Sequence, residues 1–188
     1  MINKKFIQKL KKDFTDDESA RRQIISLANI ILYDSKRVIF ALHRGDIKKA
    51  EEQFTVIENI FKKLEKFGFK RIAAEGAYKA GAEEYVEAKA LYLILTNGKI
   101  SEFKGITLGY ESYLGGLCDL TGELVRRAIN EAATGNLEEV AKIKKIINNI
   151  MAELVEIDMT GYLRTKYDQA KRNLNKIEQI DYEVKIRK

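Results

Sequence analysis

Several residue types that carry specific chemistry are absent or nearly absent from this chain. Its 188 residues include no proline and no tryptophan, a single cysteine (Cys118) and a single histidine (His43). One cysteine excludes an internal disulfide and a cysteine-rich zinc site, and it fits a reducing compartment. One histidine excludes a ribonuclease site built from two histidines of one chain, and neither acidic pair described below supplies the Glu-x-x-His of a di-iron bundle. We interpret His43 as a structural residue.

Membrane and export signals are also missing. No apolar run reaches the roughly 20 residues of a transmembrane helix, and the basic segment from Met1 to Lys12 lacks the apolar core of a signal peptide. We therefore expect a soluble, cytoplasmic protein with no membrane partner. The length favours one domain over residues 1–188. The formal net charge of +6 is compatible with a polyanionic partner but does not require one.

The abundant residues favour helices. Ala, Leu, Ile, Glu, Lys and Arg dominate, no strand pattern is found, and glycines punctuate the chain. Asp16, Asp17 and Glu18 suit the first turn of a long helix, Gly45 suits its end, and Asp46 suits the cap of the next. Asn136 with Glu139 resembles a capping box at a later helix start. In order, we expect a short amphipathic opening over 3–14 and helices over 16–44, 47–67, 72–95, 107–131, 137–156 and 162–184.

Long helices joined by short connections predict an all-α, antiparallel bundle. The helix expected over 72–95 is apolar nearly all round in its second half, from Tyr85 to Leu95. Such a helix is either central in its subunit or buried in a subunit interface. We therefore infer that the chain forms oligomers.

Two pairs of acidic residues carry the strongest functional signal. Glu84 and Glu87 are spaced i,i+3, and Asp119 and Glu123 are spaced i,i+4, so each pair lies on one side of its helix and can share an ion. The first pair falls in a row with Ala80, Leu91 and Leu95, apart from the expected solvent face of Glu75, Lys79, Glu83 and Lys89. A carboxylate in an apolar row is costly unless it is paired, metal-bound or at a functional surface.

The second acidic pair shares its stripe with glycines. Leucines form one face of that helix, and the other face holds Ser112, Gly115, Gly116, Asp119, Glu123, Arg126 and Asn130. Acids, an arginine and glycines on one stripe suit a site where a phosphate approaches the backbone. Because 33% of the residues are charged, either pair could instead be solvated or ion-paired with a neighbouring helix.

The residues left for chemistry favour a hard cation. No P-loop or dinucleotide-binding fingerprint is present, and carboxylates without His or Cys ligands favour Mg²⁺, with Mn²⁺ as the other choice. Such ions act on phosphates. Basic residues that could contact phosphates are Lys36, Arg37, Arg44, Arg126 and Arg127, with further clusters over 62–71 and 164–176. Each could equally be part of a solvated face. Phe69, Tyr78 and Tyr85 could stack on bases, although core packing explains them as well.

Four motifs occur in order between about residue 20 and the carboxyl terminus. They are Asp34-Ser-Lys-Arg-Val-Ile-Phe-Ala-Leu-His-Arg44, Glu84-Tyr-Val-Glu-Ala88, Asp119-Leu-Thr-Gly-Glu-Leu124 and Tyr162-Leu-Arg-Thr-Lys-Tyr-Asp168. Together they resemble the translin superfamily, and within it translin-associated factor X. The resemblance implies a seven-helix subunit that assembles into a hollow, often octameric shell and binds single-stranded RNA or DNA. It also implies that Glu84, Glu87 and Asp119 are metal-binding catalytic residues, with Glu123 as a further candidate.

These inferences lead to a functional hypothesis with two alternatives. We expect a homo-oligomer that binds single-stranded RNA and cleaves it as an Mg²⁺-dependent endoribonuclease, leaving 5′-phosphates. The first alternative is a translin-like protein that binds single-stranded RNA or DNA without catalysis. The second is a helical scaffold in which the acids form only structural ion pairs.

Overall fold

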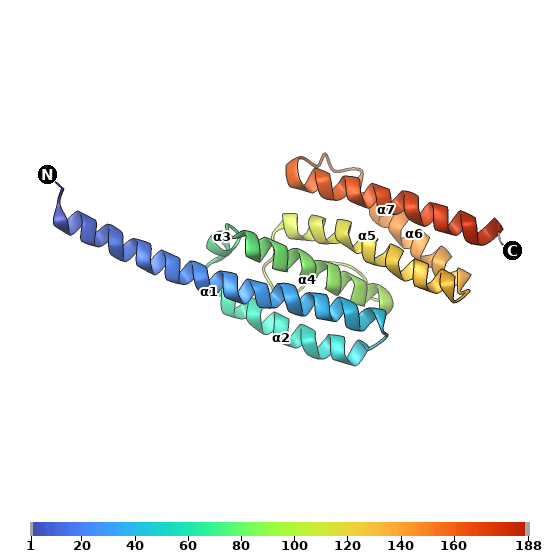
Figure 1. Cartoon of the computed structure of the whole chain (residues 1–188), viewed down its shortest axis with the longest axis horizontal. Helices are drawn as coiled ribbons and strands as arrows, with labels where there is room; N and C mark the ends of the chain where they lie inside the picture. Colours follow the sequence, from blue (N-terminus) through green and yellow to red (C-terminus); the bar gives the residue numbers. More distant parts are fainter. Residues whose placement is uncertain (1, 187–188) are drawn as a thin grey trace.

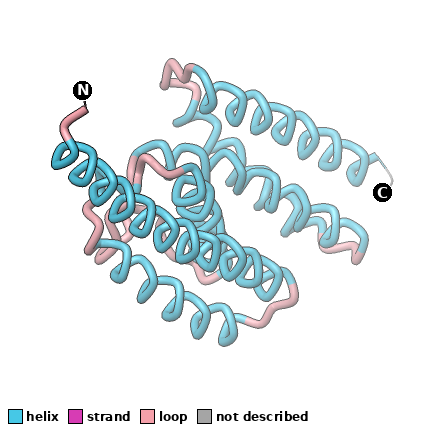
Figure 2. The backbone as a smooth tube through the Cα atoms, turned by 60° about the vertical axis from the view of Figure 1, so that its left-hand side comes forward, coloured by secondary structure: helices cyan, strands magenta, loops and turns pink. Residues whose placement is uncertain are grey.

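The computed structural model describes residues 2–186, and all of its regular elements are α-helices (Figure 1). Their bounds are α1 Lys4–His43, α2 Ile47–Glu65, α3 Phe69–Ile72, α4 Gly76–Leu95, α5 Tyr110–Ala133, α6 Leu137–Leu154 and α7 Gly161–Ile186. Over this range the backbone contains no strand (Figure 2). The predicted all-α class is confirmed. None of the described helices is both long and apolar enough to cross a membrane.

The amino-terminal segment forms one helix, so the predicted separation of an opening over 3–14 from a helix over 16–44 is wrong. Asn3 caps the start of α1, where its side-chain oxygen accepts a hydrogen bond from the Lys5 backbone N–H at 3.0 Å. No proline or glycine interrupts the chain before Gly45. The acids near residue 17 therefore lie within α1 instead of starting a helix, and two of them, Asp17 and Glu18, pair with Arg71 and Arg21.

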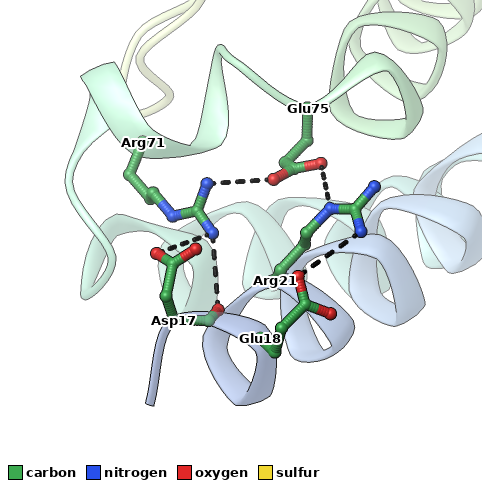
Figure 3. Close-up of polar contacts among 5 residues, drawn as sticks. All are labelled: Asp17, Glu18, Arg21, Arg71 and Glu75. Carbon is green, nitrogen blue, oxygen red and sulfur yellow. Dashed lines mark hydrogen bonds and ion pairs between the residues drawn. The ribbon is translucent and has the colours of Figure 1, made fainter. Parts of the chain in front are cut away.

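Those partners join α1 to the segment before α4 (Figure 3). Arg71 contacts Asp17 at 3.1 Å and Glu75 at 3.0 Å, while Arg21 contacts Glu75 at 3.4 Å and Glu18 at 3.6 Å. Glu75 is buried beneath the two arginines, so its predicted place on a solvent face is wrong. The helix expected from residue 72 begins at Gly76, because residues 69–72 form the separate short helix α3.

Glycines and capping side chains end and start the other helices as predicted. Gly45, after α1, has a φ of 75°, in the left-handed region that glycine adopts without strain. Asp46 accepts from the Lys49 backbone N–H at 3.2 Å, and Asn136 accepts from the Glu139 N–H at 3.4 Å. The starts of α2 and α6 therefore follow from local sequence chemistry.

Helices α4 and α5 form the centre of the bundle. Helix α1 packs against α2 and α4, α4 packs against α5, and α5 packs against α6 and α7. Glycines permit these close contacts, since a Cβ at Gly81 would lie 2.7 Å from the Ala28 carbonyl oxygen of α1 and one at Gly116 would lie 2.7 Å from the Val86 side chain of α4. The glycines of the α5 stripe thus serve helix packing, and the predicted approach of a phosphate to them is wrong.

Candidate metal and nucleic-acid site

The carboxylates of the first pair project from α4, between α1 and α5. Glu87 is buried, with 8% of its surface exposed, and Glu84 is half-buried. Helix α4 has little solvent face because α1 and α5 both pack against it. Neither residue forms a hydrogen bond or an ion pair with another side chain in the described part of the chain. Two carboxylates without partners in such a place are costly as charged groups.

The two acidic pairs are close enough to influence each other. Burial, together with repulsion from the like charges of Glu84, Asp119 and Glu123, raises the pKa of Glu87 to about 9, although Lys166 opposes the shift. Burial also raises the pKa of Glu84, while Lys36 opposes this effect and Asp119 and Glu123 add to it. The structure therefore brings the four predicted acids of α4 and α5 into one electrostatic neighbourhood.

Glu123 is held by His43, which the sequence reading placed outside the site. The His43 Nε2 of α1 forms a hydrogen bond with a Glu123 carboxylate oxygen, and Arg126 lies 3.4 Å from the same oxygen. The hydrogen bond from His43 lowers the pKa of Glu123 despite partial burial. The sequence contains one signal for this role, because His43 lies seven residues after Lys36 and shares its row on the helix.

Asp119 is held by Lys166 of α7, which the sequence offered only as part of the basic cluster over 164–176 that could contact phosphates. The Lys166 ammonium forms an ion pair with Asp119 and lies 3.4 Å from Glu83, and the Tyr162 hydroxyl donates a hydrogen bond to Glu83 at 2.8 Å. Burial alone would lower the pKa of Lys166, but the hydrogen bonds to Asp119 and Tyr162 raise it above its usual value. Glu83 is buried, so its predicted place on the solvent face is wrong.

The donor set fits a hard cation, although the side chains are not arranged around one. The four candidate ligands supply only oxygen atoms, which Mg²⁺ and Mn²⁺ prefer, and Glu87 is a buried carboxyl group without a partner. Within residues 2–186, no three His, Cys, Asp or Glu side chains converge closely enough to hold a metal ion. Instead, Lys166 pairs with Asp119, and His43 forms a hydrogen bond with Glu123. Binding of a cation by all four acids requires these two carboxylates to exchange partners.

The predicted phosphate-binding residues divide into two groups. Lys36 lies beside Glu84, and Arg126 lies beside Glu123, at the carboxylate cluster. Arg37 pairs with Asp34 at 2.6 Å, and the Arg44 guanidinium lies 5.6 Å from the centre of the Phe40 ring, on the outer side of α1. Arg127 pairs with Glu131 at 3.2 Å and approaches Glu139 at 3.8 Å, so its charge is already partnered. Tyr78 and Tyr85 belong to the core.

Two relatives are similar to this chain over most of its length. The chain is 30% identical to an uncharacterised protein of Methanocaldococcus jannaschii over 85% of this chain and 73% of that protein. It is 26% identical to the translin-associated protein X homolog of Schizosaccharomyces pombe, over 92% of this chain and 84% of the relative.

Solved structures share the whole fold. The crystal structure of apo-NeC3PO superposes with a TM-score of 0.86 at 25% identity and covers 98% of both chains. A complex of AfC3PO with duplex RNA superposes with a TM-score of 0.86 at 19% identity over 97% of both chains. The model of the Translin family matches residues 19–188. The chain is therefore a member of the Translin family and resembles its translin-associated protein X branch.

Proposed function

We propose that this protein is a homo-oligomeric, Mg²⁺-dependent endoribonuclease that acts on single-stranded RNA. The observation that carries the proposal is the cluster of Glu84, Glu87, Asp119 and Glu123, in which Glu87 is buried and has its pKa raised to about 9 by burial and by the other three acids. Such a cluster of carboxylates is unfavourable unless a positive charge, such as a metal cation, binds to it. Membership of the Translin family supports the proposal, and AfC3PO, which shares the fold, is a structure solved with duplex RNA.

The residues of the site would have three roles: binding the metal ion, binding the phosphate and positioning the metal ligands. When bound, Mg²⁺ would neutralise charge on a phosphodiester and favour loss of a proton from water. Glu84, Glu87, Asp119 and Glu123 would hold the ion. Lys36 and Arg126, at the rim, would orient the phosphate through its non-bridging oxygens. Lys166 and His43 would hold Asp119 and Glu123 in place through their contacts with these carboxylates.

Cleavage of a 5′-labelled single-stranded RNA tests the proposal. The purified protein with Mg²⁺ should cut the RNA and leave 5′-phosphates, whereas Asp119→Asn and addition of EDTA should each reduce cleavage by at least a hundredfold. Asp16→Asn, a matched change at an exposed position of α1, should cleave like the wild type. Full activity of Asp119→Asn, or products that end in a 2′,3′-cyclic phosphate, would contradict the proposal.

One feature favours the alternative of a binding protein without catalysis. Asp119 and Glu123 already have positive partners, and the described side chains form no ready group of metal ligands. A protein of this kind would bind single-stranded RNA or DNA in a salt-dependent way. Binding that survives substitution of all four acids, with no cleavage by the wild type, would select this alternative.

A further inference from the structure

Two hollows lie at opposite ends of the seam between α1 and α2. One, of about 620 Å³, is lined by residues that include Arg22, Ser26, Lys62, Lys63 and Lys66. The other, of about 560 Å³, is lined by residues that include Lys36, Arg37, Phe40, Arg44 and Lys49. Because α1 and α2 are antiparallel neighbours joined by a short turn (Figure 1), both hollows belong to one seam, which we name the α1/α2 groove.

One face of α1 runs along the whole groove. Its residues Arg22, Ser26, Tyr33, Arg37, Phe40 and Arg44 are separated by steps of three, four and seven, so they share a face. From Arg22 to Arg44 this face is about 33 Å long at the helical rise. The row with Lys36 and His43 lies on the adjacent side of α1, towards the carboxylates. Lys36 also lines the second hollow, and its charge acts on Glu84, so this end of the groove lies near the carboxylates.

Exposed aromatic rings lie between the cations of this face. Tyr33 is 59% exposed and Phe40 is 55% exposed. The Arg44 guanidinium lies over the Phe40 ring, and Arg37 is held in place by Asp34. Alternation of cations with exposed rings is the arrangement with which proteins hold single strands, because bases stack on the rings while phosphates meet the cations.

The charge of the groove argues for a polyanion and against a second copy of the chain. Among the described residues, Asp46 is the only acid that lines either hollow, and its side chain caps α2. The remaining charged lining residues are all lysines and arginines. The same face of a second copy would carry the same cations, so two copies that met face to face across this groove would repel each other.

We propose that the α1/α2 groove binds a stretch of single-stranded RNA or DNA several nucleotides long, with bases stacked on Tyr33 and Phe40 and phosphates on the flanking lysines and arginines. The groove would hold the part of a strand that lies outside the carboxylate cluster. This inference rests on the proposed function only in that the same strand would continue past Lys36 to the acids.

Binding in EDTA tests the groove without requiring catalysis. The probe is a fluorescein-labelled single-stranded RNA 20-mer, measured by anisotropy at several salt concentrations, beside the matching DNA and an RNA duplex. Arg22→Ala/Lys63→Ala/Lys66→Ala should reduce the slope of log affinity against log salt by about 2, at about 0.7 for each lost phosphate contact. Lys99→Ala/Lys104→Ala/Lys145→Ala removes the same charge from exposed positions outside the groove and should keep the slope.

The aromatic residues give a second, independent readout. Tyr33→Ala/Phe40→Ala should weaken binding of the single strand at least tenfold with an unchanged salt slope, because stacking is lost and phosphate contacts remain. Affinity for the duplex should not change, since its bases are not available to the rings. Equal affinities for single-stranded RNA and DNA would show that the groove contacts only bases and phosphates, and not the 2′-hydroxyl.

Other outcomes would overturn the inference. Absence of binding by the wild type in EDTA, or equal losses in the groove and control variants, would exclude the groove as a nucleic-acid site. A lower particle mass of the groove variants in light scattering, with binding retained, would identify the groove as a contact between copies. Binding in EDTA does not involve cleavage, so a failure of cleavage with binding to the groove intact would contradict only the proposed nuclease.

Discussion

At the scale of single residues, burial determines the state of the candidate ligands. Glu87 lies nine-tenths buried between α1 and α5 and has its pKa raised from 4.5 to about 9. At neutral pH and without a cation, this carboxyl group therefore carries a proton. Glu123 stays charged, because the hydrogen bond from His43 lowers its pKa. The same residue type thus occurs in two protonation states within one cluster.

Glu87 gives the metal-free protein a stability that falls as the pH rises. Between pH 4.5 and pH 9 the folded chain binds one proton more than the unfolded chain, so the free energy of unfolding decreases by at most about 1.4 kcal/mol per pH unit. Glu87→Gln removes this dependence, and the variant should become more stable relative to the wild type from pH 6 to pH 8. Urea unfolding in EDTA at a fixed protein concentration measures the difference.

A matched exposed substitution controls for the loss of one acidic group. Glu138→Gln changes an exposed residue of α6 and should follow the wild type at every pH. Parallel stability curves for Glu87→Gln and the wild type would show that Glu87 is ionised in the folded protein.

The sequence predicted the acids of the site better than their partners. The spacing of Glu84, Glu87, Asp119 and Glu123 along two helices was sufficient to group them, because helical geometry relates spacing to direction. Glu83 was misplaced because its burial depends on Lys166 and Tyr162 of α7. No local pattern states which distant helix will supply a cation, so long-range ion pairs could not be read from the chain.

At the scale of elements, the contact between α4 and α5 depends on the absence of a side chain at Gly116. A Cβ at this position would lie 2.7 Å from the Val86 Cβ and 2.8 Å from the Glu83 carbonyl oxygen, and backbone cannot move aside cheaply. Gly116→Ala should therefore destabilise the fold by about 1–3 kcal/mol. The change also separates the helices that carry the two acidic pairs, so cleavage should fall as well.

Gly76 provides the control for the Gly116 substitution. It is the first residue of α4, and a Cβ there meets nothing within 4 Å. Gly76→Ala should leave stability unchanged or raise it by about 0.4–1 kcal/mol, because the unfolded chain loses freedom. Thermal unfolding of both variants measures the contrast. Equal melting temperatures for Gly116→Ala and the wild type would mean that α4 and α5 adjust without strain.

Asp181 joins α7 to α6 through a buried ion pair. Its carboxylate accepts from Lys144 of α6 at 2.7 Å and from Lys185 of its own helix at 2.8 Å, and these hydrogen bonds lower its pKa. Stability from the pair is present above the unfolded pKa of 3.8 and is lost as the pH falls through the lower folded value. Asp181→Asn should cost about 1–3 kcal/mol at pH 7. Chemical denaturation should show this cost shrinking below pH 4, and a constant cost at all pH values would contradict it.

Element boundaries could be predicted where they depend on neighbours in the chain. Asp46, Gly45 and Asn136 act on backbone groups within a few residues, and the helix ends that they set agree with the sequence. Asp17 has no such local role. Its partner Arg71 lies in another element, so a pattern that resembled a helix start became the middle of α1.

At the scale of the whole molecule, α1 extends past the bundle that it belongs to. Its first part projects beyond the other helices (Figure 1). Phe6, Leu10 and Phe14 follow at steps of four along this projection and are 56%, 46% and 70% exposed. A row of large apolar side chains on an unaccompanied helix is typical of an interaction surface. A contact between copies would cover it, in agreement with the oligomer that the sequence predicts.

Replacement of this apolar row should therefore lower the particle mass in solution. Phe6→Gln/Leu10→Gln/Phe14→Gln introduces glutamine, which forms helices well, and removes most of the apolar surface of the row. The assembly should therefore dissociate into smaller species, while the far-ultraviolet circular dichroism spectrum stays the same. Lys5→Gln/Lys9→Gln/Lys12→Gln, at exposed positions of the same segment, controls for a general effect of three glutamines. Light scattering coupled to size-exclusion chromatography measures the mass. An unchanged mass for the apolar variant would show that the copies associate through other surfaces. The exposed apolar row would then be a contact for a different partner.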